Sequence, residues 1–165
     1  MNYPTIAELA GLDAQALFDR IARHMLTQRA RSTVDGTRDC LYRDLHGRAC
    51  AVGAIIPGAV YRESMEHKGI TALMLLLSLD EFNTPQHRAF SRFLTQHAPM
   101  LMNFMRIHDQ ALPELWPDDL RTLARLHALD ASVVDRFTPH THRDEWTWHE
   151  MPETLTTYEV DHVLA

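Results

Sequence analysis

Hydrophobic residues recur at helical spacing along most of this chain. Between residues 13 and 28, apolar side chains fall three and four positions apart on one face, charged ones lie opposite, and Asp13 can cap the first turn. Residues 70–79 are apolar nearly all round, which predicts a buried central helix. Further helices are predicted to start at Thr84-Pro85, at Pro99 and at Trp116-Pro117.

The segment between Cys40 and Pro57 interrupts this helical pattern. Two β-prone runs flank Asp44-Leu45-His46-Gly47, which is typical of a turn. The pattern predicts a small β-hairpin at about residues 39–56. The predicted fold class is therefore α+β and mainly α, with about five helices around one small hairpin and an acidic C-terminal extension.

Charge divides the chain into two parts. From Asp130 to the end there are eight acidic and two basic residues, a net charge of −6, while the first 129 residues carry 14 of each. We therefore predict a compact helical domain over 1–129 and an acidic, Trp-containing extension over 130–165, packed on that domain or projecting from it. Such an extension makes nucleic acid an unlikely partner, because phosphate contacts need Lys and Arg.

Composition indicates whether the protein is soluble, membrane-spanning or secreted. Hydrophobic residues make up 45% of the chain, enough for a core, and the longest apolar run is far shorter than the ~20 residues that span a bilayer. The first residues do not show the basic and then apolar pattern of a secretory signal. We expect a soluble, cytoplasmic protein with no membrane association and no cofactor.

The two cysteines, Cys40 and Cys50, both fall in the predicted hairpin. A five-residue loop would place them opposite each other, and a four-residue loop would point them to opposite faces. The favoured interpretation is two free, small, buried side chains. The alternative is a Cys50 nucleophile with His108 and Asp109 as partners, although no convergent catalytic set is evident.

Two further motifs suggest specific activities. His140, His142 and Asp144 resemble the start of the metallo-β-lactamase metal motif, but Glu145 stands where the final His would be, and a polar loop is the preferred interpretation. The stretch 123–137 has the small and apolar spacing of a helix-turn-helix. Its second helix carries one Arg and one Asp. Two packed helices therefore explain the spacing as well as a DNA-binding motif does.

Trp146 and Trp148 alternate as on a strand, which would put both rings on one face. They either cover the exposed side of the helical body or anchor another protein, since Trp is enriched in binding hot spots. Their acidic neighbours would suit a partner with a basic surface. The residues predicted to contact that partner are Trp146, Trp148, Asp144, Glu145 and Glu150.

Three separated pieces resemble a family of small uncharacterised proteins from bacteria and their phages. They are residues 17–28, the Cys-x-Tyr-Arg to Gly-x-x-Cys-Ala-Val-Gly stretch over 40–53, and Arg106-Ile-His-Asp109 followed by Trp116. The resemblance covers about residues 13–129 and implies a phage or mobile-element accessory protein, with no catalytic residue to carry over.

These observations favour a non-catalytic, protein-binding accessory protein, encoded by a phage or prophage, that inhibits a host system by occluding a partner surface. A homo-oligomer is left open. The alternatives are a small enzyme or small-ligand binder that uses Cys50, and a helix-turn-helix DNA binder.

Overall fold

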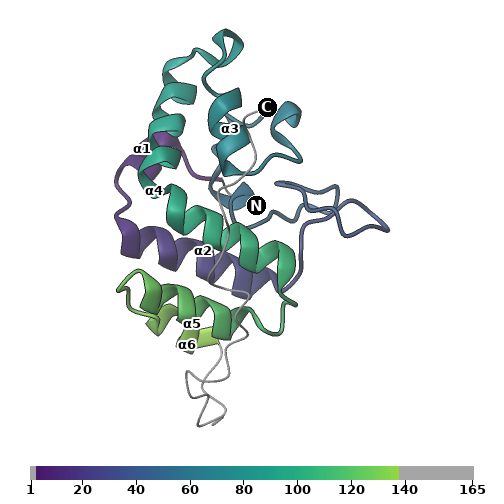
Figure 1. Cartoon of the computed structure of the whole chain (residues 1–165), viewed down its shortest axis with the longest axis vertical. Helices are drawn as coiled ribbons and strands as arrows, with labels where there is room; N and C mark the ends of the chain where they lie inside the picture. Colours follow the sequence, from purple (N-terminus) through teal and green to yellow (C-terminus); the bar gives the residue numbers. More distant parts are fainter. Residues whose placement is uncertain (1–2, 138–165) are drawn as a thin grey trace, which may run out of the picture.

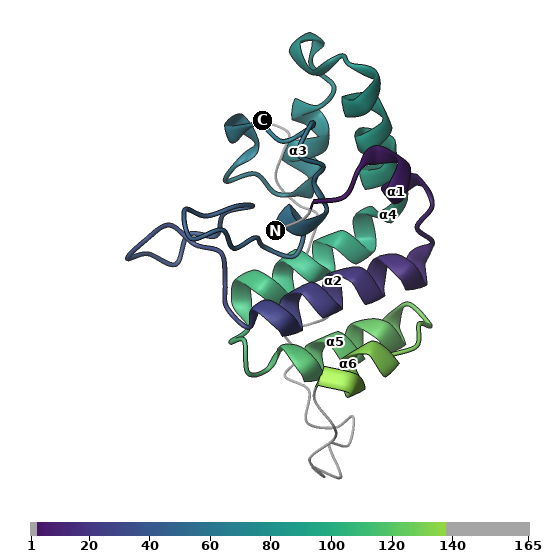
Figure 2. The ribbon, with the colours of Figure 1, turned by 180° about the vertical axis from the view of Figure 1, so that it is seen from behind.

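A computed structural model describes residues 3–137 of the chain (Figures 1 and 2). Six α-helices and three short 3-10 helices are present in this part. None of these helices is long and apolar enough to cross a membrane. The elements are α1 (Ile6–Ala10), α2 (Ala14–Gln28), η1 (Gly53–Ile55), η2 (Glu63–Met65), α3 (Ile70–Leu76), η3 (Asp80–Phe82), α4 (Pro85–Gln110), α5 (Trp116–Leu126) and α6 (Ser132–Phe137).

Helix α2 lies at the centre of the lower half of the body, with α4 on one side and the α5–α6 pair on the other (Figures 1 and 2). Both α5 and α6 contact α2, while α1 and α3 contact α4. Large side chains from these helices fill the space between them and are fully buried. The largest are Trp116, Phe18, Phe90 and Phe104. The first part of the predicted extension forms α6, which packs against α2.

Helix α2 forms where the sequence predicts it. The Asp13 carboxylate accepts the backbone N–H of Ala16 at 2.7 Å, which satisfies one of the free donors of the first turn. The helix ends at Arg29, whose φ of 49° is left-handed. Its apolar face, from Leu17 to Leu26, is buried.

Helix α4 joins two helices that the sequence predicts separately. It begins at Pro85, with the Thr84 side chain accepting the backbone N–H of His87 at 3.2 Å. It then runs through Pro99, which is exposed. A proline inside a helix removes one backbone hydrogen bond. Buried residues on both sides of it, including Leu94 and Leu101, keep one continuous apolar face against the core.

Helix α3 differs from its prediction as a helix buried on all sides. It is a seven-residue helix with Ile70 and Leu73 buried, while Leu75 is 69% exposed. Its position at one edge of the body, packed against α4, explains why one face remains in contact with solvent.

The predicted β-hairpin is wrong, and with it the α+β class, because residues 3–137 contain no strand or sheet. The segment 30–52 is irregular and projects from the helices (Figures 1 and 2), with two isolated bridges, Thr33–Cys40 and Arg43–Ala49. The Tyr42 N–H would donate to the Cys50 carbonyl if a ladder continued past the Arg43–Ala49 bridge, but it donates to Glu66 at 2.6 Å. The Ala49 N–H is directed away from Arg43 in this register and donates to Gln28 at 3.0 Å.

The turn inside this segment forms as the sequence indicates. One Asp44 carboxylate oxygen accepts the backbone N–H groups of His46 and Arg48, both at 2.9 Å. Gly47 takes a φ of 75°, which favours glycine. In this register the Cys50 backbone N–H donates to the Tyr42 carbonyl, and Cys40 pairs with Thr33 in an isolated β-bridge. The two cysteines therefore do not face each other across a hairpin. Both are free thiols.

We expect the free energy of unfolding to fall as pH is lowered from about 7 to 5. Burial lowers the pKa of three histidines, His24, His87 and His97, in the folded chain. Unfolded histidines titrate near ~6.5. Stability from the neutral rings is therefore complete above that pH and is lost as the unfolded chain takes up protons below it. Thermal melts across this pH range measure the loss.

His97 gives this expectation a residue-level test. The side chain is 7% exposed, and its Nε2 atom is buried without a hydrogen-bond partner. His97→Leu should raise the melting temperature at neutral pH and reduce its fall toward pH 5, since an unpaired buried polar group costs about 1–3 kcal/mol. Gln96, exposed on the same helix and without a titrating group, provides the matched control, and Q96L should leave the fall unchanged. An H97L variant with the full wild-type fall would contradict this prediction.

Candidate functional site

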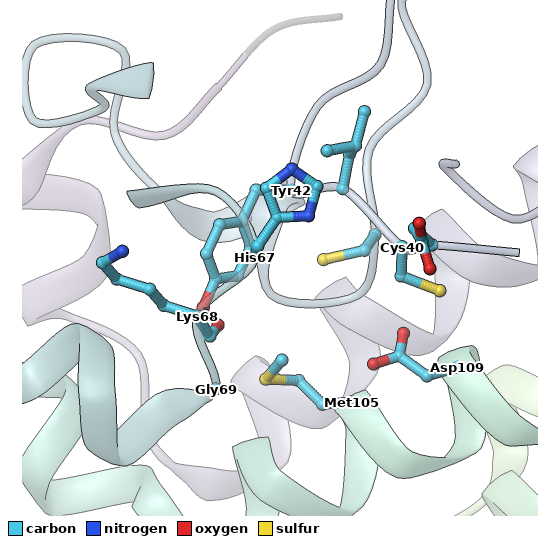
Figure 3. A pocket seen from close by; sticks show the side chains of 10 residues that line it. Cys40, Tyr42, His67, Lys68, Gly69, Met105 and Asp109 are labelled. Carbon is cyan, nitrogen blue, oxygen red and sulfur yellow. Dashed lines mark hydrogen bonds between the residues drawn. The ribbon is translucent and has the colours of Figure 1, made fainter. Parts of the chain in front are cut away.

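A pocket lies where the irregular segment meets the end of α4 (Figure 3). Its volume is about 320 Å³. The irregular segment, the turn before α3 and the last turns of α4 each supply part of its wall. The lining residues are Asp39, Cys40, Leu41, Tyr42, Cys50, His67, Lys68, Gly69, Met105 and Asp109.

Cys40 and Asp109 face each other at one side of this pocket (Figure 3). Burial, together with a hydrogen bond to the Asp109 carboxylate and its negative charge, raises the pKa of the Cys40 thiol to about 12. At neutral pH the thiol is therefore protonated, and it donates to the Arg38 carbonyl oxygen at 3.8 Å. A protonated thiol is a poor nucleophile.

His108 lies behind Asp109 and is fully buried. Its Nδ1 atom is 2.8 Å from a carboxylate oxygen of Asp109, and its Nε2 atom is 3.4 Å from the backbone nitrogen of Ser32. Because Ser32 N–H must donate, the neutral ring accepts at Nε2 and donates to Asp109 from Nδ1. The ring also stacks on Trp116, with 5.4 Å between centroids. Its orientation is thus fixed on three sides.

One donor atom each from Cys40, His108 and Asp109 lies within 4.8 Å of the others. A sulfur, an imidazole nitrogen and a carboxylate oxygen are a donor set that suits zinc. These three residues are the ones in the described chain that could hold a metal ion.

Cys50, the nucleophile of the alternative interpretation, is not part of this cluster. It is 3% exposed, and its sulfur accepts the backbone N–H of Gly53 at 3.2 Å. Burial raises the pKa of its thiol. The structure therefore brings the predicted partners His108 and Asp109 together with Cys40 in place of Cys50. The residue spacing carries no signal for this, because the contact is made by folding of an irregular segment.

The far wall of the pocket is held by Tyr42. Its hydroxyl donates to the backbone carbonyl of Lys68 at 2.6 Å. The neighbouring His67 has a φ of 60°, a left-handed conformation that is costly for a residue with a side chain. Lys68 lines the pocket opposite Asp109, and its side chain extends away from that carboxylate (Figure 3).

Glu66 fixes the base of the irregular segment and was not singled out from the sequence. This buried carboxylate accepts hydrogen bonds from Tyr42 N–H at 2.6 Å, Arg43 N–H at 3.1 Å and the Tyr61 hydroxyl at 2.7 Å. The Arg43 guanidinium lies between two aromatic rings, 3.5 Å from the centroid of Tyr3 and 4.2 Å from that of Tyr61. Glu66 thereby positions the segment that carries Cys40.

A second, shallower hollow of about 890 Å³ runs along α2. Its basic members are Arg20, Arg23 and Arg48, and Arg48 is paired with Asp44 at 2.6 Å. The acidic member is Asp19. This surface is positive overall.

The stretch predicted as an alternative helix-turn-helix forms α5 and α6. The turn between them contains Ala128 with a φ of 53°. Val133 and Val134 of α6 are buried, and its cation, Arg136, is exposed. One cation on a six-residue helix offers a DNA backbone little to contact.

The other predicted site residues lie outside the part of the chain that the structure describes. They are the partner-binding candidates Trp146, Trp148, Asp144, Glu145 and Glu150 and the metal candidates His140, His142 and Asp144.

Comparison of the chain with protein-family models, with curated proteins and with solved structures gave no match. The family resemblance therefore stays a prediction from the sequence, and function has to be argued from the residues themselves.

Proposed function

We propose that this protein binds a partner protein with a basic surface, and that residues 138–165 make the contact. The observation that carries the proposal is the separation of charge. Residues 138–165 hold six acidic residues and one basic residue, a net charge of −5, which leaves −1 of the total −6 for residues 1–137. Two of the three tryptophans of the chain, Trp146 and Trp148, lie in the same short stretch.

The helical body supports this proposal by giving the segment a fixed point of departure. Helix α6 ends at Phe137, and an Arg29 guanidinium nitrogen lies 3.4 Å from the Phe137 carbonyl oxygen, to which it donates. Aromatic anchors surrounded by like charges are typical of a segment that recognises an oppositely charged protein.

The state of the two thiols also weighs against the enzyme alternative. The pKa values of Cys40 and Cys50 are both raised by burial, which is the reverse of what a nucleophilic cysteine needs. The resemblance to bacterial and phage proteins is the reason to look for the partner in a host bacterium, where binding would block a surface of that partner.

We expect removal of residues 138–165 to abolish partner capture. Full-length chain, a chain ending at Phe137, and a W146A/W148A variant would be immobilised side by side and exposed to bacterial lysate. The double variant keeps the charge of the segment and removes its aromatic anchors, so it separates specific docking from ion exchange. A protein retained by the full chain should be lost from both variants.

Salt provides the second readout of the same experiment. Raising the salt from about 0.05 M to 0.5 M should weaken the captured complex by roughly tenfold or more, because exposed charges are screened over a shorter distance. Equal capture by the chain ending at Phe137 would contradict the proposal. Sedimentation of the same three proteins detects self-association.

A further inference from the structure

We propose that Cys40, His108 and Asp109 form a binding site for one zinc ion. This site lies in the helical body and is independent of the proposed role of residues 138–165. Zinc binding at this site would require no partner protein.

The distances between the donor atoms carry the proposal. All three lie within 4.8 Å of one another, and the shortest separation, between His108 Nδ1 and the Asp109 carboxylate, is 2.8 Å. Donors that surround a tetrahedral zinc at ~2.0–2.3 Å are about 3.3–3.8 Å apart. Small side-chain rotations therefore convert the present arrangement into a ligand set, with Cys40 moving closer and the His108–Asp109 hydrogen bond opening.

The position of the cluster favours a cation. His108 and Asp109 occupy the last turn of α4, a 26-residue helix that ends at Gln110, and the negative end of its dipole is directed there. Asp39 adds a negative charge to the pocket and Lys68 a positive one. The nearby Arg31 is directed to the end of α4, where its guanidinium donates to the Ala111 carbonyl at 2.7 Å.

The site is open on the pocket side. The Asp109 side chain is 34% exposed and Cys40 is half-buried, whereas the His108 side chain is closed off by Trp116 and Ser32. A metal ion can therefore enter from the pocket of about 320 Å³. Three protein ligands and one open position, filled by water or a small ligand, is the arrangement of zinc sites that keep a coordination position free.

The orientation of His108 determines which hydrogen bond is lost when a metal ion binds. Nδ1 faces Asp109 and is the nitrogen available to the ion, so the ring proton must then reside on Nε2. Ser32 N–H can no longer donate to Nε2, and its 3.4 Å hydrogen bond is lost. Two buried N–H groups would then face each other without an acceptor, and the three metal–ligand bonds must outweigh that penalty.

The test uses the full-length chain and Co²⁺ as a spectroscopic substitute for Zn²⁺. We expect one Co²⁺ per chain, with sulfur-to-cobalt charge-transfer absorption, and displacement of the Co²⁺ by Zn²⁺. The C40A and D109N variants should bind at least about tenfold more weakly, since even loss of an outer partner of a metal site typically costs 10–100-fold. Circular dichroism confirms that each variant is folded.

Two matched controls distinguish this site from others in the chain. C50A removes the other thiol of the same pocket, and an H140A/H142A variant removes the histidine pair suggested by the sequence. Both should bind Co²⁺ and Zn²⁺ like the wild type. Absence of a charge-transfer band, wild-type affinity in C40A, or loss of binding in H140A/H142A would each overturn the proposal.

Discussion

Replacing Gly53 with alanine should destabilise this protein more than the same replacement at any other glycine of the described chain. A Cβ atom at position 53 would lie 1.9 Å from the Tyr42 carbonyl oxygen and 2.6 Å from its carbonyl carbon. These are backbone atoms, so no rotation of a side chain can relieve the overlap. We expect a loss of about 4 kcal/mol or more, at the upper end of single-substitution effects.

The surroundings of Tyr42 explain why the overlap cannot relax cheaply. The Tyr42 carbonyl accepts the backbone N–H of Cys50 at 3.1 Å, its N–H donates to Glu66, and its hydroxyl donates to Lys68. Moving Tyr42 away would break these contacts. Urea unfolding of G53A measures the effect, with G58A as the control, because a Cβ at Gly58 meets nothing within 4 Å. A midpoint for G53A equal to that of G58A would show that this close approach is not required.

The helices were predictable because their signals are local. Asp13 caps α2, and the apolar spacing that follows it needs no knowledge of the rest of the chain. The boundaries of a helix were less predictable where tertiary packing determines whether the helix continues. Pro99 indicates a helix start by itself, yet α4 continues through it because buried residues before and after it share one face.

In the irregular segment, the local sequence predicts the turn but not the structure on either side of it. Its turn was identified correctly from Asp44 and Gly47, and both act as turn residues do. The hairpin around it does not extend because Glu66, which lies outside the segment, takes the Tyr42 backbone donor that a ladder would need. Nothing in the pattern of residues 39–56 specifies that partner.

The candidate site was predictable only in part for the same reason. His108 and Asp109 are neighbours in sequence and were selected together, but the thiol that joins them is Cys40. Which cysteine reaches Asp109 depends on the path of the irregular segment. That path is set by the bonds of Glu66 to Tyr42 and Arg43, so the base of the segment also determines the composition of the site.

Glu66→Gln should therefore destabilise the protein strongly without changing the size of the side chain. The carboxylate of this buried residue accepts three hydrogen bonds, from Tyr42 N–H, Arg43 N–H and the Tyr61 hydroxyl. An amide has one oxygen and one NH₂ group, so it would turn a donor toward one or more of these donors. It would also remove the negative charge near the Arg43 guanidinium. We expect a loss of about 3–5 kcal/mol, as for one partner of a buried charged network.

Two other variants separate the sources of this loss. Glu63 is exposed and begins η2, the short helix that Glu66 caps, so E63Q should change stability by less than about 0.5 kcal/mol. Y61F removes a single donor to Glu66 and should cost about 1–2 kcal/mol. Urea unfolding of the three variants should show the largest loss of stability for E66Q, a smaller loss for Y61F and the smallest for E63Q. If E66Q unfolds at the same urea concentration as E63Q, the backbone bonds of Glu66 do not hold the irregular segment in place, and the position of Cys40 beside Asp109 must have another cause.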